Sequence, residues 1–399
     1  MLALSFYEVS YGAFAELPIA VAASVAQKNS LFAGAYVGLL SFESFSSIAY
    51  GGKTQHNRVW WVEQALVFNQ RLATLTLLES SSPPEKRPEA IGPRFALTRE
   101  VLQGLLAAAA KSSPSFVGLP ISLRAQGSEA EYLAQCQQAM EFIRGGRFYQ
   151  LNLLRYFWAD CAYERSALLA RLLRRGGPYS SWFELPDLAL LSLSPERFVS
   201  FRPHGQKIIA KTYPVKGTRA RREDGEQDRL ARLDLEHSVK DHAELHMIVD
   251  LLRNDLNTVS ELGSVRVEKE AQLVSFPSVH HLVAEISSCL RRDLRIGDLL
   301  RGLCPGGSIS GCPKREVLKG ISEFEQRPRG YFMGHSFYFD EGGNFDSAVL
   351  IRTLVGEGDG SGGYGLEYAA GSGITIGSDP QQELQEIWDK CQVVLSELC

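Results

Sequence analysis

Polar and apolar residues between positions 238 and 255 alternate with the period of an α-helix that buries one face. Apolar side chains recur three and four residues apart: Leu245, Ile248, Val249 and Leu252. Ser238 stands where an N-cap is expected, and Asp241 follows three residues later in a box-like position. The pattern leaves Glu244 at the edge of the apolar face. Either this carboxylate has a partner, because an unpaired buried charge is costly, or it is a solvated surface group.

A second helix is predicted from Ser128 to Gly146. Ser128 and Glu131 have the spacing of a capping box, and Gly145 and Gly146 suit a helix end. Its apolar stripe consists of Leu133, Cys136, Met140 and Ile143. Further helices are expected near residues 17–27, over 98–111 and from about Pro313.

A helix near the C-terminal end carries two carboxylates and an amine on one face. Ser378 or Asp379 suits its cap, and Pro380 suits its first position. The spacing of three and four places Glu383, Glu386 and Lys390 on one face. The apolar residues lie on the other face: Leu384, Ile387, Trp388 and Cys391. The charged face is either solvated or, together with Glu244, a site for a hard cation such as Mg²⁺, which binds carboxylates and water.

Strands are predicted where apolar residues alternate with polar ones or form short runs. The expected ranges are 33–42, 59–67, 72–78, 146–157, 190–200, 329–339 and 347–354. Residues 80–93 and 112–127 are expected to be loops. Residues 211–217 are expected to be extended and to end in a turn at Gly217, directly after Lys216.

Composition excludes several classes of protein. The chain has 399 residues, of which 45% are hydrophobic, so it is long enough to bury a sizeable core. The net charge is −4 and basic residues are scattered, which argues against nucleic-acid binding. No apolar run reaches the length of a membrane span, and the seven cysteines contain no CxxC pair. We therefore expect a soluble, reduced, cytoplasmic protein without a membrane partner.

The glycine-rich segment from Pro305 to Lys314 (PGGSISGCPK) is not a nucleotide-binding loop. The Walker pattern requires Lys directly after its second Gly, but Gly311 is followed by Cys312 and Pro313. The segment instead predicts a turn into a helix, whose first N–H groups favour an anion.

Several of these motifs, in this order, resemble the chorismate-utilising enzymes. They are PVKGT at 214–218, KDHAELHMIVDLLRND at 240–255, PGGSISGCPK at 305–314 and the stretch from Ala370 to Lys390. The resemblance covers about residues 145–395 and is weak before Gly127. It implies an α+β fold: one large catalytic domain of two packed, mainly antiparallel β-sheets with helices outside. Residues 1–127 would be a divergent N-terminal part integrated into this fold, and residues 128–399 the chorismate-binding catalytic region.

The resemblance also implies roles for particular residues. Lys216 and Glu196 would be catalytic, the Glu as the acid near the leaving hydroxyl. Glu244, Glu383 and Glu386 would bind Mg²⁺, which holds the ring carboxylate of chorismate. Substrate would be bound by Gln150, Thr218, His281, Ser310, Arg352, Gly371, Gly373 and Lys390. Arg suits this role because it can hold a carboxylate in bidentate geometry.

Two positions select among the activities of the family. Relatives that add water carry a Lys where Gln150 stands, and an amide cannot act as a general base. Anthranilate synthases typically have Ala at the position of Lys216, whereas aminodeoxychorismate synthases have Lys. The resemblance therefore implies that ammonia is added to chorismate, with Lys216 attacking C2 as a covalent nucleophile. Because the chain shows no glutaminase motif, ammonia would come from a separate glutamine amidotransferase subunit.

Alternatives remain open at this stage. One is an anthranilate synthase component I, and another is a non-catalytic subunit with the same fold. Several positions depart from the family pattern. His242 replaces an Arg, Ala284 replaces a Ser, and Ser310 and Cys312 replace Thr and Ala. Phe332 stands where relatives often have a Tyr that binds the same carboxylate as Arg352.

Overall fold

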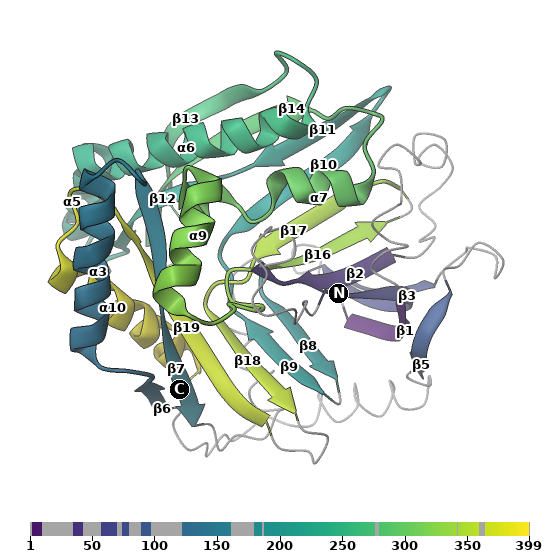
Figure 1. The fold of residues 1–399 in the computed structure, drawn as a ribbon. Coiled ribbons are helices and arrows are strands. Elements are labelled where there is room, and N and C mark those ends of the chain that lie inside the picture. Colours follow the sequence, from purple (N-terminus) through teal and green to yellow (C-terminus); the bar gives the residue numbers. More distant parts are fainter. Residues whose placement is uncertain are drawn as a thin grey trace.

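Two antiparallel β-sheets with helices outside them form the fold seen in the computed structural model (Figure 1). The structure describes residues 2–9, 35–42, 57–69, 74–79, 89–96, 122–160, 179–185, 187–275, 279–340, 342–358 and 364–398. The helices predicted near residues 17–27 and over 98–111 lie outside these ranges. The α+β class with two mainly antiparallel sheets is confirmed.

The larger sheet joins N-terminal strands to strands from the second half of the chain. Among the described residues its order is β12 (Val215–Ala220), β14 (Val279–Cys289), β11 (Lys207–Thr212), β10 (Arg197–His204), β17 (Phe345–Val349), β16 (His335–Asp340), β2 (Ala35–Leu40), β3 (Arg58–Asn69), β1 (Leu2–Val9) and β5 (Ala90–Ala96). At its sides β13 (Arg266–Ser275) pairs with β14, and β4 (Thr74–Glu79) pairs with β3. The join is the β2–β16 pair, in which Leu40 lies opposite His335.

The smaller sheet is made of strands from the middle and the end of the chain. Among the described residues its order is β15 (Gly311–Cys312), β7 (Gln150–Asp160), β19 (Tyr364–Ile374), β18 (Thr353–Gly358), β9 (Leu188–Ser192) and β8 (Ser181–Leu185), with β6 (Ser122–Ala125) beside β7. Side chains from both sheets are fully buried in one core, including Phe157 of β7, Phe201 of β10 and Leu282 of β14.

Helices cover both sheets. They are α3 (Glu129–Arg144), α5 (Gly225–Glu236), α6 (Val239–Val259), α7 (Ile296–Leu303), α8 (Gly307–Ser310), α9 (Lys314–Glu325) and α10 (Pro380–Leu398). Figure 1 shows α6 and α7 along the larger sheet, and α3 and α10 beside β7 and β19 of the smaller one. The capping box of Ser128 and Glu131 and the N-cap of Ser238 are confirmed. The apolar stripe of α6 is buried as predicted.

Two predicted strands are each divided between the sheets. The run 190–200 is β9 in the smaller sheet and β10 in the larger, and the run 347–354 is β17 in the larger and β18 in the smaller. The prediction of single strands was wrong because both halves of each run are buried and apolar, so alternation does not show where the chain changes sheet. The breaks have local causes: Pro195 lacks an N–H for pairing, and Arg352 adopts a left-handed φ of 50°.

Other predictions need smaller corrections. Gly217 is not a turn but part of β12, at a register shift between Lys216 and Thr218 in the pairing with β14. The expected loops 80–93 and 112–127 include the start of β5 and the whole of β6. The strand expected over 329–339 begins only at His335.

Candidate active site between the two sheets

The two segments that cross between the sheets carry Glu196 and Arg352. They run side by side: the Leu193 N–H donates to the Arg352 carbonyl at 3.0 Å, and the Val349 N–H donates to the Glu196 carbonyl at 3.2 Å. The chain therefore brings an acid and a guanidinium, 156 positions apart in sequence, to the same region between the sheets.

Glu196 has the environment of a carboxylic acid that holds its proton. Burial raises its pKa, while the Lys216 ammonium and a hydrogen bond from Ser308 oppose this rise. Ser308 Oγ lies 3.5 Å from Glu196 Oε1. A buried carboxyl with a raised pKa is suited to donate a proton to a leaving group.

Lys216 is the group on which the site converges. It lies on β12 opposite Leu282 of β14. Its charge lowers the pKa of three carboxyls from three different elements: Glu196, Glu244 of α6 and Glu386 of α10. Such an effect requires the charged groups to be near each other. The structure thus gathers the predicted nucleophile, the predicted acid and two predicted metal ligands.

Gly217 makes this placement of Lys216 possible. Its φ is +67°, a value that residues with a side chain rarely adopt. A Cβ at this position would lie 2.6 Å from Leu235 Cδ1 and 3.0 Å from Asp241 Cβ. The backbone of β12 can therefore pack against α5 and α6 only with glycine here.

Glu244 and Glu386 form a pair of like charges surrounded by amines. Burial raises the pKa of Glu244, and the Glu386 charge adds to the rise. Burial also raises the pKa of Glu386, but the Lys390 ammonium lowers it, and the net pKa is lowered. Lys390 Nζ lies 2.6 Å from Glu386 Oε1. On the other side, Lys240 Nζ lies 3.9 Å from Glu244 Oε1.

Glu383 lies near α3. Its charge acts on Tyr132 and Cys136 of α3. Within the described ranges, no three His, Cys, Asp or Glu side chains are arranged to hold a metal ion. The pair of Glu244 and Glu386 nevertheless fits Mg²⁺, which takes one or two protein carboxylates and completes its shell with water and substrate oxygens.

The wall formed by β7 and β19 contains the predicted Gln150, Gly371 and Gly373. A Cβ on Gly373 would lie 2.7 Å from Gln150 Nε2, and a Cβ on Gly371 would lie 2.6 Å from Asn152 Oδ1. Lys390 of α10 donates to the Gly371 carbonyl at 2.5 Å. Gln150 Oε1 and Asn152 Oδ1 are buried and have no hydrogen-bond partner among the described residues. Because a buried acceptor normally receives a hydrogen bond, these two amide oxygens are available to a donor group of a ligand.

Thr218 and His281 form a second polar group behind Lys216. Thr218 Oγ1 lies 3.0 Å from His281 Nδ1, and the Gly217 carbonyl lies 3.1 Å from the same nitrogen. Burial lowers the pKa of His281, and the nearby Arg352 charge lowers it further. A neutral imidazole beside the Arg352 guanidinium leaves that guanidinium available for an anion.

In the glycine-rich segment the hydroxyl nearest to the acid is not the predicted one. Ser310 is fully buried, and its Oγ donates to the Gly306 carbonyl at 2.8 Å within the segment. Ser308 is the residue that reaches Glu196. Sequence reasoning missed Ser308, Asn152 and Lys240. Each lies within two to four residues of a predicted site residue, but only the fold shows which way the side chain points.

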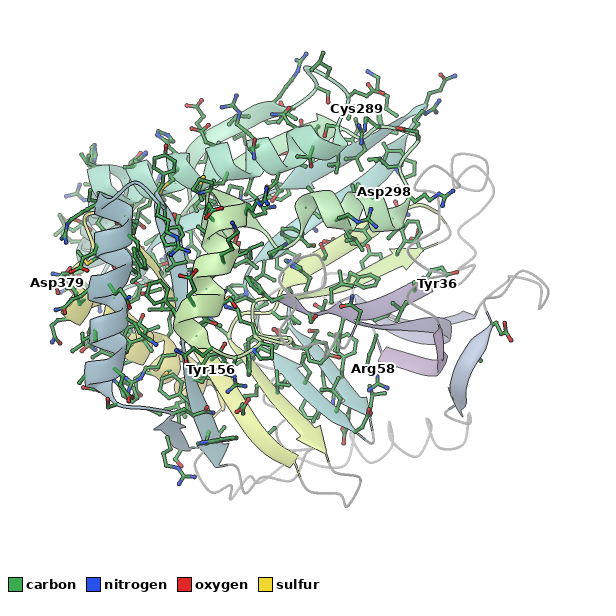
Figure 2. The ribbon with its side chains drawn as sticks, in the orientation of Figure 1. Tyr36, Arg58, Tyr156, Cys289, Asp298 and Asp379 are labelled. Atoms are coloured by element: carbon green, nitrogen blue, oxygen red, sulfur yellow. The ribbon has the colours of Figure 1, made fainter. Side chains whose placement is uncertain are left out.

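Three of the residues that depart from the family pattern pack or hydrogen-bond within the fold. Phe332 is buried and packs edge-on against Tyr156, which is labelled in Figure 2, with ring centroids 5.9 Å apart. Ala284 is fully buried in β14. His242 Nε2 lies 3.0 Å from the Glu236 carbonyl at the end of α5. At the start of α10, Asp379 (Figure 2) rather than Ser378 accepts the capping hydrogen bond, from the Gln382 N–H.

A Ser–His–Asp hydrogen-bond chain lies next to the site but belongs to the scaffold. Ser275 Oγ is 2.7 Å from His280 Nδ1, and His280 Nε2 is 3.1 Å from Asp228 Oδ1. Arg221 and the Arg222 N–H also bind Asp228. These bonds fasten α5 to the end of the β13–β14 hairpin.

Comparison with known proteins shows the family of this chain. Residues 13–396 match the sequence profile described as chorismate binding enzyme. Aminodeoxychorismate synthase component 1 from Klebsiella aerogenes is 40% identical over 277 residues, which are 69% of this chain and 59% of that protein. The protein of the same name from Escherichia coli K12 is 37% identical over 67% of this chain and 57% of its own length. The chain thus spans less than two thirds of the length of these relatives.

The fold is similar to a solved structure over almost its whole length. Anthranilate synthase component I from Streptococcus pneumoniae superposes with a TM-score of 0.78 at 23% identity, covering 99% of this chain and 91% of that one. In the described part of the molecule, every helix is too short or too polar to cross a membrane.

Proposed function

This chain belongs to the family of chorismate binding enzymes, and from that premise we propose that it is an aminodeoxychorismate synthase component 1. It would convert chorismate and ammonia into 4-amino-4-deoxychorismate, a precursor of p-aminobenzoate and folate. The observation that carries the proposal is the convergence of Lys216 with Glu196, Glu244 and Glu386.

The residues divide the reaction into two displacements. The Lys216 ammonium first gives a proton to solvent. Its neutral amine then forms a bond to C2 of chorismate, the ring double bond shifts, and the 4-hydroxyl leaves as water with the proton of Glu196. Ammonia then bonds to C4, the double bond shifts back, and the Lys216 amine is released. The proton that ammonia loses restores Glu196, so the net products are the 4-amino compound and water.

The remaining residues bind and orient the substrate. Arg352 offers a planar pair of donors to a carboxylate, and the neutral His281 beside it does not compete for that anion. The amides of Gln150 and Asn152 offer acceptors to a donor such as ammonia or a hydroxyl. Gly371 and Gly373 give the side chains of Asn152 and Gln150 room to pack against the backbone of β19.

Mg²⁺ would be held by Glu244 and Glu386, with Glu383 as a further candidate. When bound, it would hold and neutralise the ring carboxylate of chorismate. Lys390, which binds both Glu386 and the Gly371 carbonyl, would keep the Glu386 carboxylate ionised and directed to this place.

The proposed source of ammonia is a separate glutamine amidotransferase subunit, and the proposed location is the cytoplasm. A name that includes "component 1", as in the relatives above, supports a partner subunit. Anthranilate synthase component I is the second candidate, because the protein of that name from Lactococcus lactis is 30% identical over 84% of this chain, but Lys216 favours the 4-amino product.

The test is an assay of the purified chain with chorismate, ammonium chloride and Mg²⁺, with and without a lyase that cleaves aminodeoxychorismate to p-aminobenzoate. Mass spectrometry should show the 4-amino compound, and p-aminobenzoate should appear only with the lyase. Glutamine in place of ammonium should give no product, and excess chelator should abolish turnover. Fluorescent anthranilate as the main product would reassign the enzyme, and no product at all would favour the non-catalytic alternative.

A further inference from the structure

Three amines lie around the two proposed metal-binding carboxylates. Lys216 acts on both Glu244 and Glu386, Lys390 is hydrogen-bonded to Glu386, and Lys240 is paired with Glu244. Lys240 also lowers the pKa of Glu386, which belongs to another helix. Its charge is therefore felt by both carboxylates and not only by its neighbour one helical turn away.

Of the amines paired with these carboxylates, Lys240 is the one that can leave. Its side chain is 80% exposed, and its Nζ lies 3.9 Å from Glu244 Oε1, a loose contact. Lys390 is 39% exposed and is bound twice, to Glu386 Oε1 at 2.6 Å and to the Gly371 carbonyl at 2.5 Å. A solvated amine on a flexible stem can move into water at little cost.

We propose that Lys240 is the exchangeable counter-cation of the Glu244–Glu386 pair: it neutralises the pair without metal and competes with the divalent cation for it. This inference rests on the proposed function, because it assumes that these carboxylates bind Mg²⁺. A divalent cation that binds the pair would displace the Lys240 ammonium from Glu244. The positive charge of Lys240 would also repel that cation. Lys240 thus sets the metal affinity of the empty enzyme and disfavours binding of the cation before the anionic substrate arrives.

The test is a titration of the full chain with Mn²⁺ in the absence of chorismate, with free Mn²⁺ measured by electron paramagnetic resonance. Lys240→Gln should bind Mn²⁺ about two- to fivefold more tightly than the wild type, the range expected for loss of an exposed ion pair. The matched control is Lys319→Gln. It removes the same charge from an exposed helical pair, with Glu316 at 2.7 Å, and should leave Mn²⁺ affinity unchanged.

Ionic strength gives a second readout. The advantage of Lys240→Gln should shrink as salt is raised from about 0.02 M to 0.5 M, because salt screens exposed charges. Unchanged or weaker Mn²⁺ binding by Lys240→Gln, or an equal gain in Lys319→Gln, would overturn the inference.

Glu244→Gln separates failure of this inference from failure of the metal assignment. If Glu244→Gln loses Mn²⁺ binding while Lys240→Gln behaves as the wild type, only the role of Lys240 is rejected. If Glu244→Gln binds Mn²⁺ as the wild type does, the metal site is elsewhere and both are rejected.

Discussion

Lys216 has a central place in the proposed chemistry, since it is the proposed nucleophile and its charge acts on three carboxyls. If it is the covalent nucleophile, Lys216→Ala should lower aminodeoxychorismate formation by about 10²-fold or more, because an activated nucleophile is lost. Ammonia could then attack C2 directly, so we also expect a 2-amino product and slow formation of anthranilate. Product analysis by mass spectrometry measures both.

Lys216→Arg separates the covalent role from an electrostatic one. Arg keeps the positive charge, but its guanidinium stays protonated and cannot attack carbon. We expect this variant to be as inactive as Lys216→Ala. Wild-type activity of Lys216→Arg would falsify the covalent role and leave Lys216 as a neighbour that only balances charge.

Glu196 links the activity to pH. A general acid must be protonated, and burial raises the pKa of Glu196, so activity should be lost as pH rises through that raised value. Glu196→Gln should lower kcat by about 10²- to 10⁴-fold, the usual range for a general acid.

The Ser308 hydroxyl lowers the pKa of Glu196, so Ser308→Ala should move the alkaline limb of the kcat/KM profile to higher pH. A limb that does not move would assign the acid to another group.

At the scale of elements, β12 shows how one strand positions a reactive side chain. Gly217→Ala adds a Cβ at a positive φ and against Leu235 and Asp241, so it should lower the free energy of unfolding by about 2–4 kcal/mol and misplace Lys216. Denaturant unfolding and kcat measure the two effects. The control is Gly225→Ala, where a Cβ would have no atom within 4 Å. Equal behaviour of the two variants would remove the argument that β12 requires glycine.

The helices of the site could be predicted from sequence because their signals are local. Ser128 with Glu131, Ser238 with Asp241 and Pro380 after Asp379 each act within one turn, and the structure has each helix start there. The points where the chain passes from one sheet to the other could not be predicted. They depend on pairing between strands that are far apart in sequence, such as β9 and β18.

The same limit applies to the site residues. The charged faces of α6 and α10 indicate that Glu244 and Glu386 lie on helix surfaces, but not that those surfaces face each other. Only tertiary structure separates Glu383, which faces α3, from Glu386 one turn later, which faces Lys216. It likewise directs Ser308 rather than Ser310 towards the acid.

At the scale of the whole molecule, His335 ties stability to pH at the junction of the N-terminal and C-terminal strands. It is 1% exposed, stacks on Phe198 with ring centroids 4.0 Å apart, and lies opposite Leu40 of β2. Burial, together with the Lys314 charge, lowers the pKa of His335 to about 3. Between this value and about 6.5, the unfolded value for His, the unfolded chain binds a proton that the folded chain does not.

His335 should therefore make the protein less stable as pH falls. Its contribution to the free energy of unfolding is complete above about pH 6.5 and declines by about 1.4 kcal/mol per pH unit between pH 6 and pH 4. His335→Ala should lower stability at pH 7 and reduce this slope, which urea unfolding at several pH values measures. Ser336→Ala, a buried neighbour that does not titrate, should keep the wild-type slope. A slope in His335→Ala equal to that of the wild type would contradict the assignment.

The paired crossings between the sheets also hold Glu196 and Arg352 in a fixed relation to each other. The bond from Leu193 to Arg352 continues the β9–β18 pairing of the smaller sheet, and the bond from Val349 to Glu196 continues the β10–β17 pairing of the larger sheet. Each crossing is therefore held at both of its ends by strand pairing, one end in each sheet. On the helices, Glu244 and Glu386 keep 36% and 51% of their side chains exposed, so the proposed metal-binding pair is in contact with water. A divalent cation would therefore reach this pair directly from water, without any movement of the two crossings.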